Sequence, residues 1–245
     1  MSTPGQANED LVATGSTWAF VLDGATPRAG VDSGCVHTVT WLVAQLGAAL
    51  SRQLFLHDRP LSDLVAAAID ETCGAHGPAC DLSNPDSPSS TVAVIRENST
   101  SESVDYLILA DSPVVFDTAD GVQVVTDTRS GSLPVYTAES VRAARNQPDG
   151  FWVASTKPEA AYQAVIGSVD RADVRRAAAF TDGAARYTER FALGSWADAL
   201  DLLESDPGCL IKQVRAAEGS ENAAQQARRR DKQHDDATAV LMTWD

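Results

Sequence analysis

Apolar positions follow two different periods along the chain, and these periods divide it into helices and strands. Residues 18–22 (Trp-Ala-Phe-Val-Leu) form a continuous apolar run that ends at Asp23-Gly24, which predicts a buried strand entering a turn. Apolar residues spaced by three and four come next and predict a helix with one apolar face, capped by Asp32 or Ser33. That face is expected to carry Val36, Val39, Val43, Leu46 and Leu50. A second amphipathic helix is predicted over residues 61–72.

The middle and end of the chain are rich in β-forming runs. Asp120-Gly121 separates two such runs and is typical of a tight hairpin, so the strands are expected to be antiparallel. The polar stretches 81–90 and 216–233 predict loops. Further strands are predicted at 91–96, 104–110, 114–116, 122–126, 164–169, 177–181 and 237–243, and further helices at 137–146, 195–204 and 208–218. Helices segregated from antiparallel strands favour an α+β layered fold, with residues 1–245 as one domain.

The charge balance narrows the classes of partner. The chain has 245 residues, with 19 basic against 34 acidic side chains and a net charge of −15. This balance argues against nucleic acid, which needs a basic surface, and against an anionic membrane. The start of the chain lacks the pattern of a secretory signal, no apolar run reaches about 20 residues, and the four cysteines form no dense framework. A cytoplasmic location is therefore expected.

Acidic residues recur at the ends of the apolar strands. Asp23-Gly24, Asp182-Gly183 and Asp235-Asp236 lie at three strand ends, Asp111 ends a fourth, and residues 8–10 (Asn-Glu-Asp) add a further cluster. Buried carboxylates are costly unless they are paired or bound to metal, and hard cations prefer oxygen ligands. One Asp-Gly pair is a common turn, so the ordered set carries the argument. The sequence predicts an all-oxygen site for two metal ions that activates water and binds a phosphoryl group.

In its ordered motifs the chain resembles the metal-dependent protein phosphatases of type 2C. The motifs, in the order of that family, are NED at 8–10, VLDGAT at 21–26, SSTVAV at 89–94, LADS at 109–112, FTDG at 180–183 and DDAT at 235–238. They span nearly the whole chain. The resemblance implies a four-layer α-β-β-α sandwich with two central antiparallel sheets, and two Mg²⁺ or Mn²⁺ ions at one end, with a third as a further option.

The resemblance also implies a role for each matching residue. Asp23 would bridge both ions and orient the attacking water, Gly24 would offer its carbonyl to the second ion, and Glu9 would bind that ion directly or through water. Asp182 and Asp235 would bind the first ion. Three acids remain as additional candidates, for a third ion or for contacts behind the ligands: Asp111, Asp10 and Asp236.

The chain departs from the family pattern at the phosphate-binding arginine, whose position is Gly5 here. Arg28 and Arg186 are the candidate substitutes, because a bidentate arginine is a strong phosphate contact. The expected activity is hydrolysis of phosphoserine or phosphothreonine, or of another phosphomonoester, in a phosphorylated protein or small molecule of a bacterial cytoplasm. The alternative is a binding or regulatory module that keeps the sandwich but has little or no turnover.

Three other patterns in the sequence suggest different chemistry, and each is less specific than the ordered acidic motifs. VLDGAT also resembles the first strand of haloacid-dehalogenase-type phosphatases, but the second aspartate that such chemistry needs is replaced by Ala25. Histidine side chains can act as acids near neutral pH, so His37 is a candidate, although a helix-surface role is favoured for it. Cys73, His76 and Cys80 offer only three irregularly spaced zinc ligands, so free thiols and a loop histidine are expected.

Overall fold

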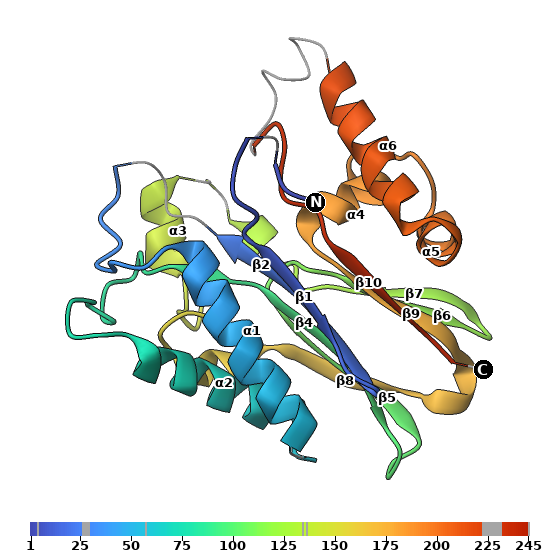
Figure 1. The fold of residues 1–245 in the computed structure, drawn as a ribbon, viewed down its shortest axis with the longest axis horizontal. Coiled ribbons are helices and arrows are strands. Elements are labelled where there is room, and N and C mark those ends of the chain that lie inside the picture. Colours follow the sequence, from blue (N-terminus) through green and yellow to red (C-terminus); the bar gives the residue numbers. More distant parts are fainter. Residues whose placement is uncertain are drawn as a thin grey trace.

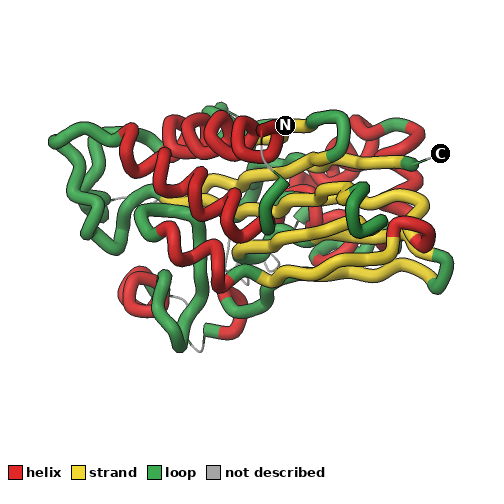
Figure 2. Tube along the Cα trace, turned by 90° about the horizontal axis from the view of Figure 1, so that it is seen from below, coloured by secondary structure: helices red, strands yellow, loops and turns green. Residues whose placement is uncertain are grey.

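Two antiparallel sheets lie face to face between two layers of helices, in the order helix, sheet, sheet, helix (Figures 1 and 2). The computed structural model describes residues 1–3, 5–25, 30–56, 58–133, 135, 137–221 and 232–244. This arrangement confirms the predicted α+β four-layer sandwich. Among the helices of those residues, none combines the length and apolar character that a membrane span requires.

The first sheet has the strand order β1-β2-β4-β5-β8, with β3 paired to β2. Its helices α1 and α2 cover the outer face, and η2 packs against α2. The elements of this half are β1 (Asp10–Thr14), β2 (Trp18–Ala25), α1 (Val39–Leu56), α2 (Leu61–Ala75), β3 (Ser89–Ser90), β4 (Val92–Asn98), β5 (Ser103–Leu109), η2 (Pro158–Gln163) and β8 (Val165–Asp170).

The second sheet has the order β10-β9-β6-β7, and α4, α5 and α6 lie over its outer face (Figure 1). Its elements are β6 (Val114–Thr118), β7 (Gly121–Val125), β9 (Val174–Phe180), α4 (Asp182–Glu189), α5 (Trp196–Ser205), α6 (Pro207–Ser220) and β10 (Ala239–Thr243). The connections contain η1 (Ser130–Ser132), α3 (Ala138–Ala144) and η3 (Arg171–Asp173).

Side-chain alternation in β2 explains why its apolar run is continuous. Phe20 and Leu22 pack with the helices of the outer layer, whereas Val21 packs between the two sheets. All three are fully buried. Because successive side chains of a strand point to opposite faces, a strand covered on both faces needs apolar residues at every position. The run therefore leads Asp23 out of the core at a fixed end of the sandwich.

The structure corrects three details of the predicted elements. Helix α1 begins at Val39, so Val36 lies before it and is 67% exposed. Asp32 does not cap that helix, because its Oδ1 accepts the N–H of Gly34 within the preceding loop. Residues 216–220 of the predicted loop are helical, since α6 continues to Ser220, and most of the remaining stretch lies outside the described residues. The sequence interpretation did not include β1 and α4. Both are short and begin at acidic residues, β1 at Asp10 and α4 at Asp182.

Candidate metal centre

Asp23 lies near the end of β2, where neighbouring strands fix its backbone. Asp10 of β1 is its partner in the antiparallel register. The N–H of Asp23 donates to Oγ1 of Thr91 at 3.2 Å, and that hydroxyl also shares a 2.6 Å hydrogen bond with Ser112. Both hydroxyls are buried. The SSTV and LADS motifs therefore hold the position of Asp23 from two further strands.

Gly24 allows the N-terminal segment to approach β2 closely. Its N–H donates to the carbonyl of Glu9 at 3.1 Å. A Cβ at this position would lie 2.6 Å from that same carbonyl oxygen and 2.5 Å from Cγ1 of Val39. Such distances exclude a side chain without a shift of the surrounding backbone. The glycine therefore permits Glu9 to lie beside Asp23.

Asp182 joins the second sheet to the first. It follows β9 as the first residue of α4, and its N–H donates to Oδ2 of Asp23 at 3.4 Å. Carboxylates are favoured at a helix N-terminus, where the backbone N–H groups carry partial positive charge. The acids from the two ends of the chain thus meet where the two sheets end.

Asp235 reaches the same cluster from the segment before β10, and basic side chains hold it. Its Oδ2 accepts from Nη2 of Arg186 at 3.2 Å, and its Oδ1 lies 3.4 Å from Nζ of Lys232. Arg186 in turn binds Glu218, whose side chain is fully buried, at 2.7 Å. Glu218 also accepts from Arg215 at 2.7 Å. This network ties the position of Asp235 to α4 and α6.

Asp236 binds the backbone of the N-terminal segment. Its Oδ1 accepts the N–H of Thr3 at 2.6 Å, and its Oδ2 accepts the N–H of Glu9 at 2.5 Å. Because both oxygens of Asp236 accept from backbone donors, its position suits the second option given for it, a contact behind the ligands, better than direct binding of an ion. Its carboxylate instead positions Glu9, while Asp235 is the member of the pair that turns toward the cluster.

Burial and neighbouring negative charges raise the pKa of two carboxyl groups of the cluster, Asp23 and Asp182. Burial raises the pKa of Asp23 well above its ordinary value, and the charges of Asp182, Asp10, Asp235 and Asp111 raise it further. Burial, followed by the charges of Asp235 and Asp111, raises the pKa of Asp182 to about 7. Asp182 is exposed and Asp23 is half-buried, so the cluster is accessible from solvent where the sheets end.

The two remaining acidic candidates differ in exposure to solvent. Asp10 is buried, and its Oδ2 accepts from Oγ1 of Thr181 at 2.9 Å. Burial is the main cause that raises the pKa of Asp10 to about 6. Asp111 is exposed after β5, and its Oδ2 accepts from Oγ of Ser130 at 2.8 Å. Asp111 is thus the more accessible candidate for an additional ion.

Of the two arginines expected to bind phosphate, Arg28 lies outside the described residues. Arg186 is 4% exposed and is already bound to Glu218 and Asp235, so the expectation that it contacts substrate phosphate is wrong in this geometry. Lys232 is the basic residue that the sequence interpretation missed. Its side chain is 53% exposed. Burial acts to lower the pKa of Lys232, but the negative charges of Asp235, Glu9 and Asp23 outweigh this effect and raise it.

The donor set suits hard divalent cations. The side chains that converge are carboxylates, together with the Gly24 backbone, and oxygen donors are those that Mg²⁺ and Mn²⁺ prefer. In the described part of the chain, no three of these acids have oxygens that all lie within 4.8 Å of one another.

The fold and this acidic cluster define a class of protein: an α-β-β-α sandwich with a group of acidic side chains where its two sheets end. The family model described as protein phosphatase 2C matches residues 3–240. The chain belongs to the protein phosphatase 2C family, and its enzymatic class is that of the metal-dependent protein serine/threonine phosphatases. This confirms the family resemblance seen in the sequence motifs.

Solved structures share the fold at low sequence identity. The Mycobacterium tuberculosis serine/threonine phosphatase PstP/Ppp is 14% identical with a TM-score of 0.58, and the match covers 98% of this chain and 93% of that chain. The Staphylococcus aureus serine/threonine phosphatase Stp1 is 10% identical with a TM-score of 0.60, and the match covers 100% of this chain and 92% of that chain. The PstP catalytic domain in complex with two manganese ions is 13% identical with a TM-score of 0.55, covering 98% and 92%. A comparison with curated protein sequences found no match.

Proposed function

We propose that this chain hydrolyses phosphoserine and phosphothreonine in protein substrates, with two Mg²⁺ or Mn²⁺ ions held at the acidic cluster. The observation that carries the proposal is the meeting of acids from distant parts of the chain: the N–H of Asp182 donates to Asp23, and the charges of Asp182 and Asp235 add to burial in raising the pKa of Asp23. In the absence of a cation this arrangement is electrostatically unfavourable. A site that repels its own charges is suited to binding positive charge.

The ligand roles follow from the position of each group. Glu9, Asp23, Gly24, Asp182 and Asp235 would hold the ions. When bound, the ions supply a more acidic water and neutralise charge on the phosphoryl group. Asp111 is the candidate for a third ion, because its charge acts on both Asp23 and Asp182.

The remaining residues keep these ligands in place. Thr91 fixes the backbone of Asp23, and the Asp236 carboxylate fixes that of Glu9. Arg186 orients Asp235 from α4. Pre-arranged ligands avoid the cost of reorganisation when charge develops on the reacting group. These residues act through the ligands and do not touch the substrate.

Lys232 is the proposed substrate-phosphate contact in place of the arginine that Gly5 replaces. Its ammonium is partly exposed and lies beside Asp235 and Glu9. A lysine provides a point charge for a phosphate oxygen, without the fixed fork of an arginine. Binding of the ground-state phosphate is therefore expected to be weaker and less directional than with a bidentate arginine.

The decisive experiment is hydrolysis of an aryl phosphate and of phosphoserine and phosphothreonine peptides, with Mn²⁺ or Mg²⁺ added. Asp23→Asn and Asp182→Asn should abolish phosphate release, and Asp120→Asn, in the exposed β6–β7 hairpin, is the matched control. Activity that persists in both cluster variants or in excess chelator contradicts the metal mechanism. Stoichiometric Mn²⁺ binding without turnover of any of these substrates would favour a binding module.

A further inference from the structure

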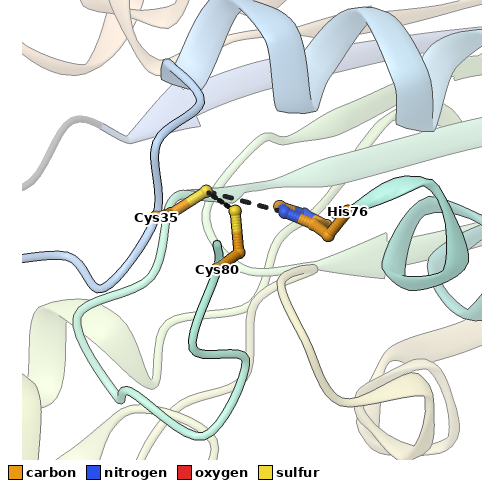
Figure 3. Close-up of side chains that lie close together, drawn as sticks. All are labelled: Cys35, His76 and Cys80. Carbon is orange, nitrogen blue, oxygen red and sulfur yellow. Dashed lines mark hydrogen bonds between the residues drawn. The ribbon is translucent and has the colours of Figure 1, made fainter. Parts of the chain in front are cut away.

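A second group of metal-ligating side chains lies outside the acidic cluster. Cys35 belongs to the loop before α1, and His76 and Cys80 follow the end of α2. The Sγ atoms of Cys35 and Cys80 are 3.4 Å apart, and Sγ of Cys35 lies 3.6 Å from Nδ1 of His76. Figure 3 shows these three side chains pointing toward one another from the two loops. All their donor atoms lie within 4.8 Å of one another.

These separations are close to those that one tetrahedral zinc ion imposes. Zn–S bonds of about 2.3 Å and Zn–N bonds of about 2.0–2.1 Å place two sulfurs about 3.8 Å apart and a sulfur and a nitrogen about 3.5 Å apart. An adjustment of a few tenths of an ångström would seat the ion. A disulfide bond, by contrast, requires a sulfur separation of about 2.05 Å and gives the imidazole no role.

The surroundings orient the ligands. The N–H of His37 donates to Sγ of Cys35 at 3.4 Å, a contact that suits a thiolate sulfur. The His76 ring packs edge-on against Trp41 at a centroid distance of 4.7 Å, and the His37 ring stacks on Trp41 at 3.8 Å. The N–H of Asp81 donates to the carbonyl of Gly34 at 2.7 Å, which joins the two loops independently of any metal.

We propose that Cys35, His76 and Cys80 form a zinc-class transition-metal site, distinct from the hard-metal centre of the acidic cluster. Thiolate and imidazole donors select soft or borderline ions such as Zn²⁺, whereas the carboxylates of the acidic cluster select Mg²⁺ or Mn²⁺. Binding releases the two thiol protons to solvent, with no change of oxidation state. Three protein ligands leave a fourth position for water or an outside ligand, as in open zinc sites.

The site would join two loops that border the metal centre. The loop that contains Cys35 connects the end of β2, with Asp23 and Gly24, to α1. The loop that follows Cys80 leads to β3 and to Thr91, whose hydroxyl accepts the N–H of Asp23. An ion bound by both loops would therefore restrict their relative movement without contacting the acidic cluster.

The test uses the full chain after reduction and removal of metal, titrated with Co²⁺ and Zn²⁺. We expect one thiolate-to-cobalt charge-transfer band that Zn²⁺ abolishes by displacement. Cys35→Ser, Cys80→Ser and His76→Gln should each weaken binding more than about tenfold. Cys209→Ser, on α6, is the matched control and should bind as the wild type does. Asp23→Asn should also keep the band, which separates this site from the acidic cluster.

Alkylation provides a measurement that does not depend on activity or on folding of a variant. Bound Zn²⁺ should slow the reaction of Cys35 and Cys80 in the wild-type chain and leave that of Cys209 unchanged. Equal reaction rates with and without Zn²⁺, or a wild-type chain without the cobalt band, would overturn the proposal. A Cys35–Cys80 disulfide that forms in air from the reduced chain at the same rate with and without excess Zn²⁺ would likewise overturn it, in favour of a redox pair.

Discussion

The N–H of Asp182 donates to a carboxylate oxygen of Asp23 across 159 positions of sequence, at 3.4 Å. The donor lies at the start of α4 over the second sheet, and the acceptor lies near the end of β2 in the first. This backbone hydrogen bond holds the acidic side chains of Asp23 and Asp182 close to each other. A divalent cation would neutralise the negative charge of the two carboxylates.

Asp23→Asn should separate stability from function. An asparagine oxygen still accepts the Asp182 N–H, while loss of the charge relieves the repulsion that raises the pKa of Asp23. We expect a higher Tm in the metal-free protein, together with a loss of phosphatase activity of more than about 100-fold. Thermal unfolding in chelator and turnover with Mn²⁺ measure the two effects. A variant with lower metal-free Tm would contradict the repulsion argument.

The metal-free protein should lose stability as the pH rises toward neutrality. Asp182 and Asp10 have pKa values of about 7 and about 6 in the folded chain, against an ordinary value of 3.8. The folded state thus holds protons that the unfolded state has released. The stability that these bound protons give to the folded state is complete below pH 3.8, and it is lost as the pH rises through about 6 and 7. The Tm in chelator should therefore be higher at about pH 5 than at about pH 7.5.

Divalent cations should reverse this loss at neutral pH, since they neutralise the carboxylates in place of protons. The measurement is the rise in Tm on adding Mn²⁺ at each pH, which we expect to be larger at about pH 7.5 than at about pH 5. Asp182→Asn should flatten the pH dependence in chelator. A metal-free Tm that increases steadily between these pH values would show that the acids are not strained in the folded state.

Lys232→Met should raise KM for phosphate substrates more than it changes kcat, because the ammonium is proposed to contact the bound phosphate. Loss of a charged hydrogen bond predicts an increase in KM of about 10-fold or more. Lys212→Met, on the exposed face of α6, is the matched control and should leave KM unchanged. Steady-state kinetics at saturating Mn²⁺ separates this role from metal binding. If only the Mn²⁺ concentration needed for activity changes, Lys232 acts on Asp235 and does not contact the substrate phosphate.

The fold and the identities of the clustered acids follow from sequence, whereas the division of roles among them does not. The run 18–22 and the Asp-Gly pairs predicted which strand ends carry acids. Neighbouring residues Asp235 and Asp236 have the same chemistry, and only the tertiary structure shows that one faces Arg186 and the other the N–H groups of the N-terminal segment. The ligand assignments themselves stay predictions.

Residues that the sequence interpretation missed owe their positions to long-range contacts. Lys232 lies in a polar stretch that predicts a loop, and nothing in its local pattern indicates that Asp235, Glu9 and Asp23 surround it. The pairing of Cys80 with Cys35 also crosses 45 positions, whereas the local pattern suggested Cys73, which instead lies near the Ser155 carbonyl. Spacing along the chain cannot show such contacts, because they depend on how loops from separate elements meet.

Asp236→Ala should destabilise the chain and impair metal binding together. The substitution leaves the N–H groups of Thr3 and Glu9 without the acceptor that now holds them. An unpaired buried N–H costs about 1–3 kcal/mol, so the free energy of unfolding should fall by at least that amount. Denaturant unfolding in chelator measures the loss, and Mn²⁺ titration measures the effect on Glu9. Unchanged stability would mean that the N-terminal segment is held by other contacts.

Gly183→Ala should disrupt the acidic cluster by steric force alone. A Cβ at Gly183 would lie 1.9 Å from the backbone oxygen of Asp236, so α4 and the segment before β10 must separate. We expect a loss of about 3 kcal/mol or more in the free energy of unfolding, with weaker Mn²⁺ binding because Asp182 and Asp235 move apart. Gly219→Ala, near the end of α6, meets nothing within 4 Å and is the matched control. It should be neutral or stabilising by up to about 1 kcal/mol. Equal stability of the two variants in denaturant unfolding would show that α4 does not pack against the Asp235–Asp236 backbone as closely as the structure places it.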